Sequence, residues 1–126
     1  MSIQDQLDKL LNSQRDCTLT AFSDLSSGLV LRSSSDAPCP REKLDDLCMT
    51  AVSCFGLVDA SDLPDEIDAD VFGTSIVHFS ARRTQVFVRP TPSSDDVICA
   101  VNDTHASVEP ILRAAQAAVL TIAGET

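Results

Sequence analysis

The most reactive side chains in this sequence are its cysteines, and their number and spacing argue against a metal centre. The sequence holds five of them, Cys17, Cys39, Cys48, Cys54 and Cys99. The count is odd, no C-x-x-C pair occurs, and four of the five stand among apolar residues. This pattern favours buried, reduced thiols over a disulfide framework or a zinc site, and we therefore expect a cytoplasmic protein.

The remaining candidates for chemistry are two histidines and an arginine pair. His78 alternates with apolar residues in a strand pattern, and His105 precedes the last helix, so nothing in the sequence brings them together. We interpret each as a surface or interface histidine rather than a ligand or a base. Arg82 and Arg83 lie in a predicted hairpin turn. We interpret them as solvated surface charges, and an arginine finger is the alternative.

Motifs for catalysis and cofactor binding are also missing from the sequence. It contains no G-x-x-x-x-G-K-[ST], no G-x-S-x-G and no H-E-x-x-H, and four glycines in total cannot form a Gly-rich phosphate loop. We therefore expect a protein that is not an enzyme and that binds no cofactor and no metal.

Charge indicates the kind of partner. The net charge of −10 repels nucleic acid and anionic membranes, and the absence of Trp and Tyr removes the usual stacking platforms for single strands. Six acids and no base occur in residues 59–70, within a predicted acidic loop at 56–72. This loop is either solvated surface or a contact for a basic partner, and its candidate contact residues are Asp65, Glu66, Asp68 and Asp70.

Periodicity along the chain predicts the fold that must position these groups. A helix capped by Ser2 is followed by a hairpin whose strands, 17–22 and 29–32, are joined by a turn with Gly28. A helix through Phe55, strands at 74–80, 84–89 and 97–101, and a helix at 108–122 complete the order α-β-β-α-β-β-β-α. This order predicts an α+β fold with one antiparallel sheet, and the 126 residues predict a single domain, 1–126.

Strand patterns also predict which faces are buried. In the first strand, simple alternation places Cys17, Leu19 and Ala21 on one face and Thr18, Thr20 and Phe22 on the other. Residues 97–101 are apolar at every position, which predicts an interior strand with helices on both sides. No apolar run approaches the ~18 residues of a membrane-spanning helix, and the N-terminus lacks the pattern of a signal peptide.

The middle helix suggests self-association. Its apolar residues span an arc of roughly 220°, about twice the stripe that a helix needs to cover one sheet. Extra burial under the acidic loop is one explanation, and a subunit interface is the one we favour. We predict a homodimer formed by this helix and the third strand, with Cys48, Met49, Val52, Ile76 and His78 near the two-fold axis.

The chain resembles the Roadblock family, which includes Roadblock dynein light chains and bacterial Roadblock-domain regulators of small Ras-like GTPases. The resemblance rests on the hairpin at 27–31, the Leu/Ala helix at 44–55, and the strand at 95–101 followed by the helix at 108–122. It implies a five-stranded antiparallel sheet with one helix on one face and two on the other. It also implies homodimerisation through the third strand and second helix, and a non-catalytic scaffold or regulator that binds a small GTPase or a motor or signalling assembly.

Two other classes stay open. An acidic, dimeric chaperone of the type III secretion kind has a similar size and charge, but three strands usually precede its middle helix, whereas two are readable here. A small-molecule sensor of the profilin-like or PAS-like kind needs a cavity inside its layers. The small residues of the last helix, Ala114, Ala115, Ala117 and Ala118, predict close packing there instead.

Overall fold

The computed structural model has the element order that the sequence predicts. It describes residues 2–60, 74–80, 83–103 and 108–124. Along the chain the elements are α1 (Ile3–Ser13), β1 (Cys17–Asp24), β2 (Leu29–Ser35), α2 (Arg41–Asp59), β3 (Ser75–Phe79), β4 (Thr84–Val88), β5 (Asp96–Asn102) and α3 (Val108–Gly124). The α+β class is therefore confirmed.

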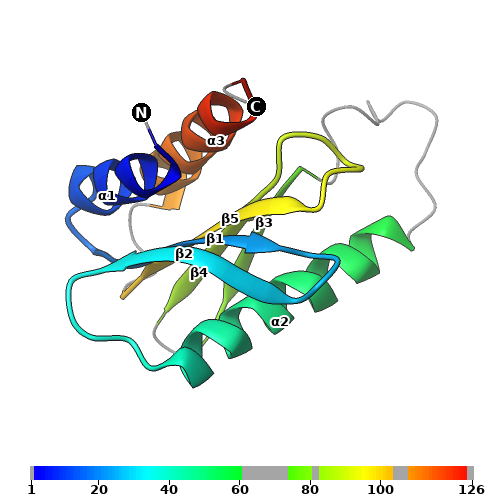
Figure 1. Cartoon of the computed structure of the whole chain (residues 1–126), viewed down its shortest axis with the longest axis horizontal. Coiled ribbons are helices and arrows are strands. Elements are labelled where there is room, and N and C mark those ends of the chain that lie inside the picture. Colours follow the sequence, from blue (N-terminus) through cyan, green and yellow to red (C-terminus); the bar gives the residue numbers. More distant parts are fainter. Residues whose placement is uncertain (1, 61–73, 81–82, 104–107, 125–126) are drawn as a thin grey trace.

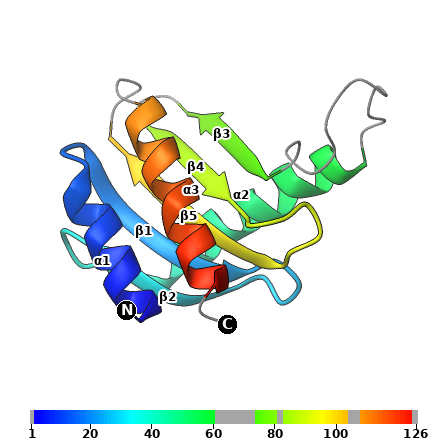
Figure 2. The ribbon, with the colours of Figure 1, turned by 90° about the horizontal axis from the view of Figure 1, so that it is seen from above.

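All strands belong to one antiparallel sheet in the order β2-β1-β5-β4-β3. The helices α1 and α3 lie side by side on one face, and α2 lies alone on the other (Figures 1 and 2). This is the predicted arrangement of two helices against one. It leaves β2 and β3 as the two edge strands of the described sheet.

The sheet separates two apolar cores, and β5 contributes to both of them. Ile98 and Ala100 pack with α1 and α3, whereas Val97, Cys99 and Val101 pack with α2. Every residue from Val97 to Val101 is less than 5% exposed. The prediction of an interior strand covered on both sides is confirmed.

The β1–β2 hairpin confirms one prediction and corrects another. Gly28 has φ +71°, the left-handed conformation expected for the turn. The predicted face of Cys17 is wrong, because it packs with Phe22 under α1 and α3 while Leu19 and Ala21 pack under α2. Cys17 pairs with Asn102 and Leu19 with Val101, so Thr18 is an extra residue, and this β-bulge reverses the alternation.

Helix ends follow local chemistry with one difference from the prediction. The Ser2 hydroxyl accepts a hydrogen bond from the Asp5 backbone N–H, and the Asp5 carboxylate accepts one from the Ser2 N–H. Helix α2 continues one turn beyond Phe55, through Gly56, and ends at Asp59. In the described part of the chain, no helix has both the length and the apolar character needed to cross a bilayer.

Candidate protein-interaction surface

The outer side of α2 is an apolar surface on a strongly acidic chain. The ten residues from Met49 to Val58 include no charged side chain. Met49, Ser53 and Leu57 recur every four residues and therefore lie on one face, which points away from the sheet. Met49 is 53% exposed and Leu57 is 75% exposed, and the small residues Ser53 and Gly56 lie between them along the helix. A second helix can approach such a face closely.

The three α2 residues predicted at the two-fold axis differ in their exposure. Cys48 is fully buried against the sheet, so its side chain supports the outer surface from beneath. Val52 is half-buried at the side of the core. The Met49 sulfur lies 3.6 Å from the point where a side chain on Gly28 would begin, which places Met49 over the tip of the β1–β2 hairpin.

The two predicted residues of the third strand lie at the opposite edge of the sheet. Ile76 packs against the core under α2, and His78, two residues on, shares that face of β3. The His78 Nδ1 atom lies 2.9 Å from Oε1 of Gln85, its cross-strand neighbour. Phe79 ends the strand with 57% of its side chain exposed. The structure thus separates Met49, beside the hairpin, from Ile76 and His78 at the β3 edge.

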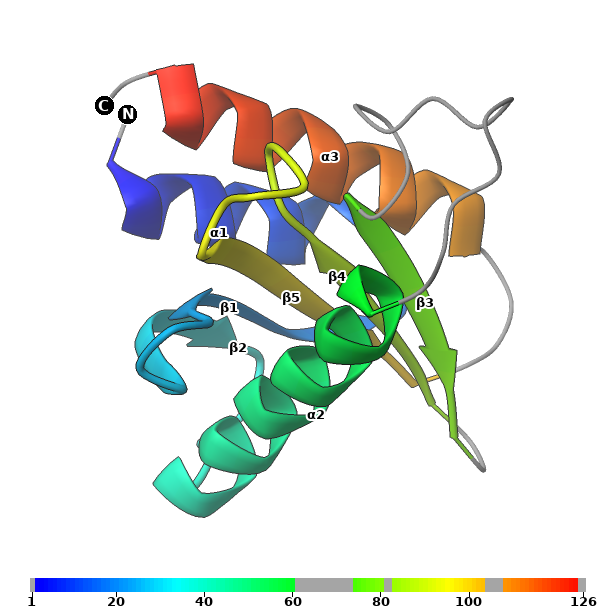
Figure 3. The ribbon, with the colours of Figure 1, turned by 90° about the vertical axis from the view of Figure 1, so that its right-hand side faces the viewer.

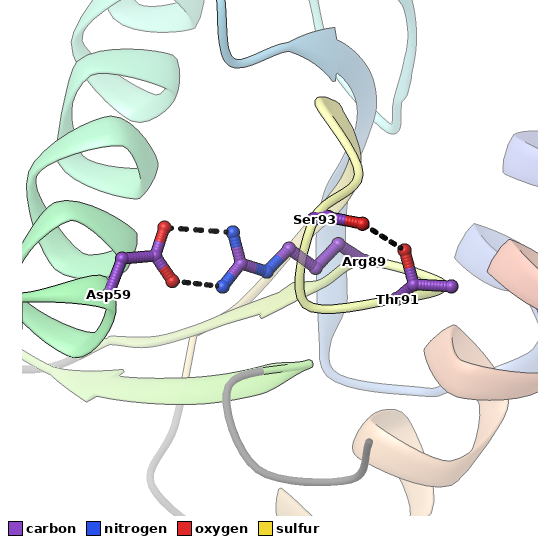
Figure 4. Close-up of polar contacts among 4 residues, drawn as sticks. All are labelled: Asp59, Arg89, Thr91 and Ser93. Carbon is purple, nitrogen blue, oxygen red and sulfur yellow. Dashed lines mark hydrogen bonds and ion pairs between the residues drawn. The ribbon is translucent and has the colours of Figure 1, made fainter. Parts of the chain in front are cut away.

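An ion pair that the sequence did not predict fastens the end of α2 to the sheet (Figure 4). Arg89 follows β4, and its guanidinium contacts both carboxylate oxygens of Asp59 at 2.6 and 3.2 Å. The Arg89 side chain is 3% exposed and lies over the Phe55 ring, 4.2 Å from the centroid. Its backbone N–H donates to the Thr74 carbonyl at 2.7 Å. Arg89 therefore joins the end of α2 to Thr74, the residue that precedes β3.

Several predicted functional residues lie outside the described residues. These are the candidate partner contacts Asp65, Glu66, Asp68 and Asp70, together with Arg82 and His105. Arg83 is described, and it lies 3.8 Å from Asp103 with both side chains more than half exposed. Within the described ranges, no three side chains of His, Cys, Asp or Glu come together as a metal site would require.

The cysteines are placed where thiolate chemistry is suppressed. Cys17, Cys48 and Cys99 are buried, and Cys39 and Cys54 are partly exposed. Burial raises the pKa of the Cys99 thiol to about 12 and the pKa of Cys17 to about 11. Desolvation also raises the pKa of Cys48 and of Cys54. Because the thiolate is the reactive form, these four thiols are poor nucleophiles near neutral pH.

Comparison with solved structures identifies the architecture. The chain superposes on a Roadblock/LC7 domain from Streptomyces avermitilis with a TM-score of 0.72 and 11% identity, covering 99% of this chain and 98% of that one. The chain has the Roadblock fold. The gliding protein MglB from Thermus thermophilus gives a TM-score of 0.69 at 18% identity, covering 100% of this chain and 94% of MglB. By sequence, the chain matches no protein-family model and no curated protein.

The Roadblock fold shares its architecture with profilin. Schizosaccharomyces pombe profilin gives a TM-score of 0.64 at 11% identity, covering 98% of each chain. At identities this low, each of these similarities shows a shared fold and nothing more. The shared fold includes α2 and the edge strand β3, and it does not by itself assign a function.

Proposed function

We propose that this chain is a non-catalytic, homodimeric regulatory subunit that binds a protein partner, most directly a small Ras-like GTPase. The observation that carries the proposal is the full-length match to Roadblock domains, including the gliding protein MglB. The Roadblock resemblance implies regulators and scaffolds, and this sequence contains no G-x-x-x-x-G-K-[ST], G-x-S-x-G or H-E-x-x-H motif. The alternative to a small GTPase is a protein of a motor or signalling assembly.

The charge-free surface of α2 and the edge strand β3 support the homodimer. Strand β3 has a neighbour on only one side in the described sheet, so a second copy can pair with it in antiparallel fashion. Pairing across a two-fold axis makes the contact self-complementary and brings the two α2 helices together. In this proposed dimer Ile76 and His78 lie at the paired edges and Val52 remains a predicted contact. Met49, over the hairpin at the other edge of the sheet, lies away from the two-fold axis, and Cys48 stays within the core.

Light scattering of the purified chain tests the dimer directly. At micromolar concentration we expect a mass twice the 13.5 kDa of one chain. Burial of the apolar α2 surface and extension of the sheet provide the association energy. A mass of one chain throughout the micromolar range would contradict the proposal.

The acidic residues 65–70 are proposed to speed encounter with a basic surface on the partner. Neutralising Asp65, Glu66, Asp68 and Asp70 to Asn or Gln should lower the association rate constant more than it changes the dissociation rate constant. The difference should shrink between 0.1 M and 1 M salt, as the Debye length falls from about 10 Å to about 3 Å. Stopped-flow or surface-based kinetics against a GTPase captured from native lysate provides the measurement.

A control with the same total charge isolates the position of these acids. It neutralises four exposed acids elsewhere on the chain, Glu42, Asp95, Asp96 and Glu109. Equal association rates for the two variants would leave residues 65–70 as ordinary solvated surface. Hydrolysis of a nucleoside triphosphate by the isolated chain would refute the non-catalytic assignment.

Strand count separates this proposal from the secretion-chaperone alternative. Such chaperones usually place three strands before the middle helix, and here α2 follows two, β1 and β2. The alternative of a small-molecule sensor shares the profilin-like fold, but fold alone does not assign a ligand. The regulatory subunit is therefore the function we propose.

A further inference from the structure

A groove of about 430 Å³ lies between α2 and one end of the sheet, on the same face as the proposed dimer surface. Helix α2 crosses the strands obliquely (Figure 3), and the groove lies beside the first half of this helix. Five elements line the groove, together with the linker from β2 to α2. None of Met49, Val52, Ile76 and His78 lines this groove.

The strand register defines the floor of the groove. Leu19 lies opposite Ser35 on one side and Val101 on the other, and Val101 lies opposite Gln85. These four residues line the groove and form one row across the strands β2, β1, β5 and β4. The row ends at Gln85, because His78, its partner on β3, does not line the groove. With strands about 4.8 Å apart, the four lining strands give a row of about 14 Å, which matches about four residues of extended chain.

Chemistry along the row changes from apolar to polar. The apolar part of the floor is Leu19, which is partly exposed, whereas Leu47 of α2 and Val101 are less than 5% exposed and belong to the core. When His78 donates a hydrogen bond from Nδ1 to the side-chain oxygen Oε1 of Gln85, the side-chain NH₂ group of Gln85 can donate to a peptide carbonyl. With this tautomer of His78, the groove presents the partly exposed Leu19 to an aliphatic side chain and the Gln85 side-chain amide to a peptide carbonyl.

The walls of the groove carry a surplus of negative charge. On the α2 side Asp46 is exposed and stands three residues after Lys43. On the opposite side, Arg83 lies 3.8 Å from Asp103, so the charges of this pair offset each other. Asp36 is a further acid in the lining of the groove. The remaining charges are the carboxylates of Asp36 and Asp46 and the ammonium group of Lys43. A basic segment is therefore complementary to this groove.

We propose that the groove binds an extended segment of a protein partner, with an aliphatic side chain on Leu19 and a lysine or arginine at Asp46. The length of the floor and its mixture of apolar and amide groups fit a peptide backbone with one central anchor. This site goes beyond the proposed GTPase regulation, because it names a peptide-binding surface that is separate from the dimer surface. It does not depend on the homodimer.

The test uses the peptide acetyl-Lys-Val-Leu-Val-Lys-Trp-amide. The chain contains no Trp and no Tyr, so the peptide can be followed by tryptophan fluorescence anisotropy without protein background. Amide shifts in two-dimensional NMR spectra report where it binds. We expect sub-millimolar binding and shifts at Leu19, Gln85 and Val101. The acidic counterpart, with Glu in place of both Lys residues, should bind more weakly.

A pair of charge reversals on α2 provides the matched comparison. Asp46→Lys should raise the dissociation constant of the basic peptide about fivefold or more, because it converts an attraction into a repulsion. Glu42→Lys makes the same charge change at an exposed site on the same helix outside the groove, and it should change binding less than about twofold.

Three results would overturn the groove proposal. The first is that no groove residue shifts at about 2 mM peptide, which corresponds to negligible affinity. The second is that the two charge reversals change peptide binding equally. The third is that the acidic peptide binds at least as tightly as the basic one. Since the readout is local to the groove, each of these leaves the mass measurement of the dimer unaffected.

Discussion

Replacing Asp59 by asparagine is expected to lower the free energy of unfolding by about 1.5–3 kcal/mol, because the buried Arg89 guanidinium loses its carboxylate. Arg89 is 4% exposed, and the bond at 2.6 Å is of the short, charge-assisted kind. The Asp59 side chain is 53% exposed. Water therefore compensates part of the loss, which keeps the expected value below that for a fully buried pair.

The reciprocal change should cost less. Arg89→Met removes the cation and keeps an unbranched side chain beside Phe55, while the carboxylate of Asp59 remains in water. We expect a loss of about 1 kcal/mol or less. The double variant should resemble Arg89→Met alone, because Asp59 has no buried cation to neutralise once Arg89 is gone.

Urea unfolding at one fixed protein concentration measures these differences, since self-association changes apparent stability. The control is the pair of Arg113 and Glu109, whose side chains are 76% and 70% exposed. Glu109→Gln should change stability by less than about 0.5 kcal/mol. If Asp59→Asn were no more destabilising than this control, Arg89 would not fasten α2 to the sheet as described.

Local patterns were sufficient to predict the elements but not every contact between them. The apolar run at 97–101 could only be a covered strand, and Gly28 marked the turn, because both depend on neighbours in sequence. The bulge at Thr18 depends instead on how β1 meets β5 at its end. Alternation within one strand cannot report that extra residue, which is why the predicted face of Cys17 was wrong.

The extent and role of α2 illustrate the same limit. Gly56 after Phe55 is a standard signal for the end of a helix, yet the helix continues to Asp59. The ion pair with Arg89, thirty residues on, holds that last turn. An arginine after a buried strand is ordinarily solvated, so its sequence position gave no sign of this contact.

The candidate site could be predicted only in part, because it depends on how α2 lies across the sheet. The wide apolar arc of α2 can be read from the sequence, and it predicted an interface. The position of Met49 over the hairpin, far from the β3 edge, depends on the angle at which α2 crosses the sheet. The partial exposure of Leu19 at the groove depends on the same angle, and periodicity does not encode it.

Leu57→Asp is expected to weaken the proposed homodimer about 10- to 100-fold, enough to give a monomeric mass at low micromolar concentration. Leu57 is the most exposed of the large apolar side chains of the described chain, at 75%. Burying it against a second α2 would contribute about 1.5–3 kcal/mol, and an aspartate there would instead place a charge in an apolar contact. Because the side chain is exposed within one chain, the fold itself should be unaffected.

Leu120→Asp is the matched control for this variant. Leu120 is 60% exposed on α3, which covers the opposite face of the sheet, and the chemical change is identical. Light scattering across a dilution series should show Leu57→Asp dissociating while Leu120→Asp keeps the mass of the unmodified protein. The reverse order would place the subunit contact on the α1 and α3 side of the sheet. Such a result would remove α2 and β3 from the interface, because a two-fold contact needs the same patch on both copies.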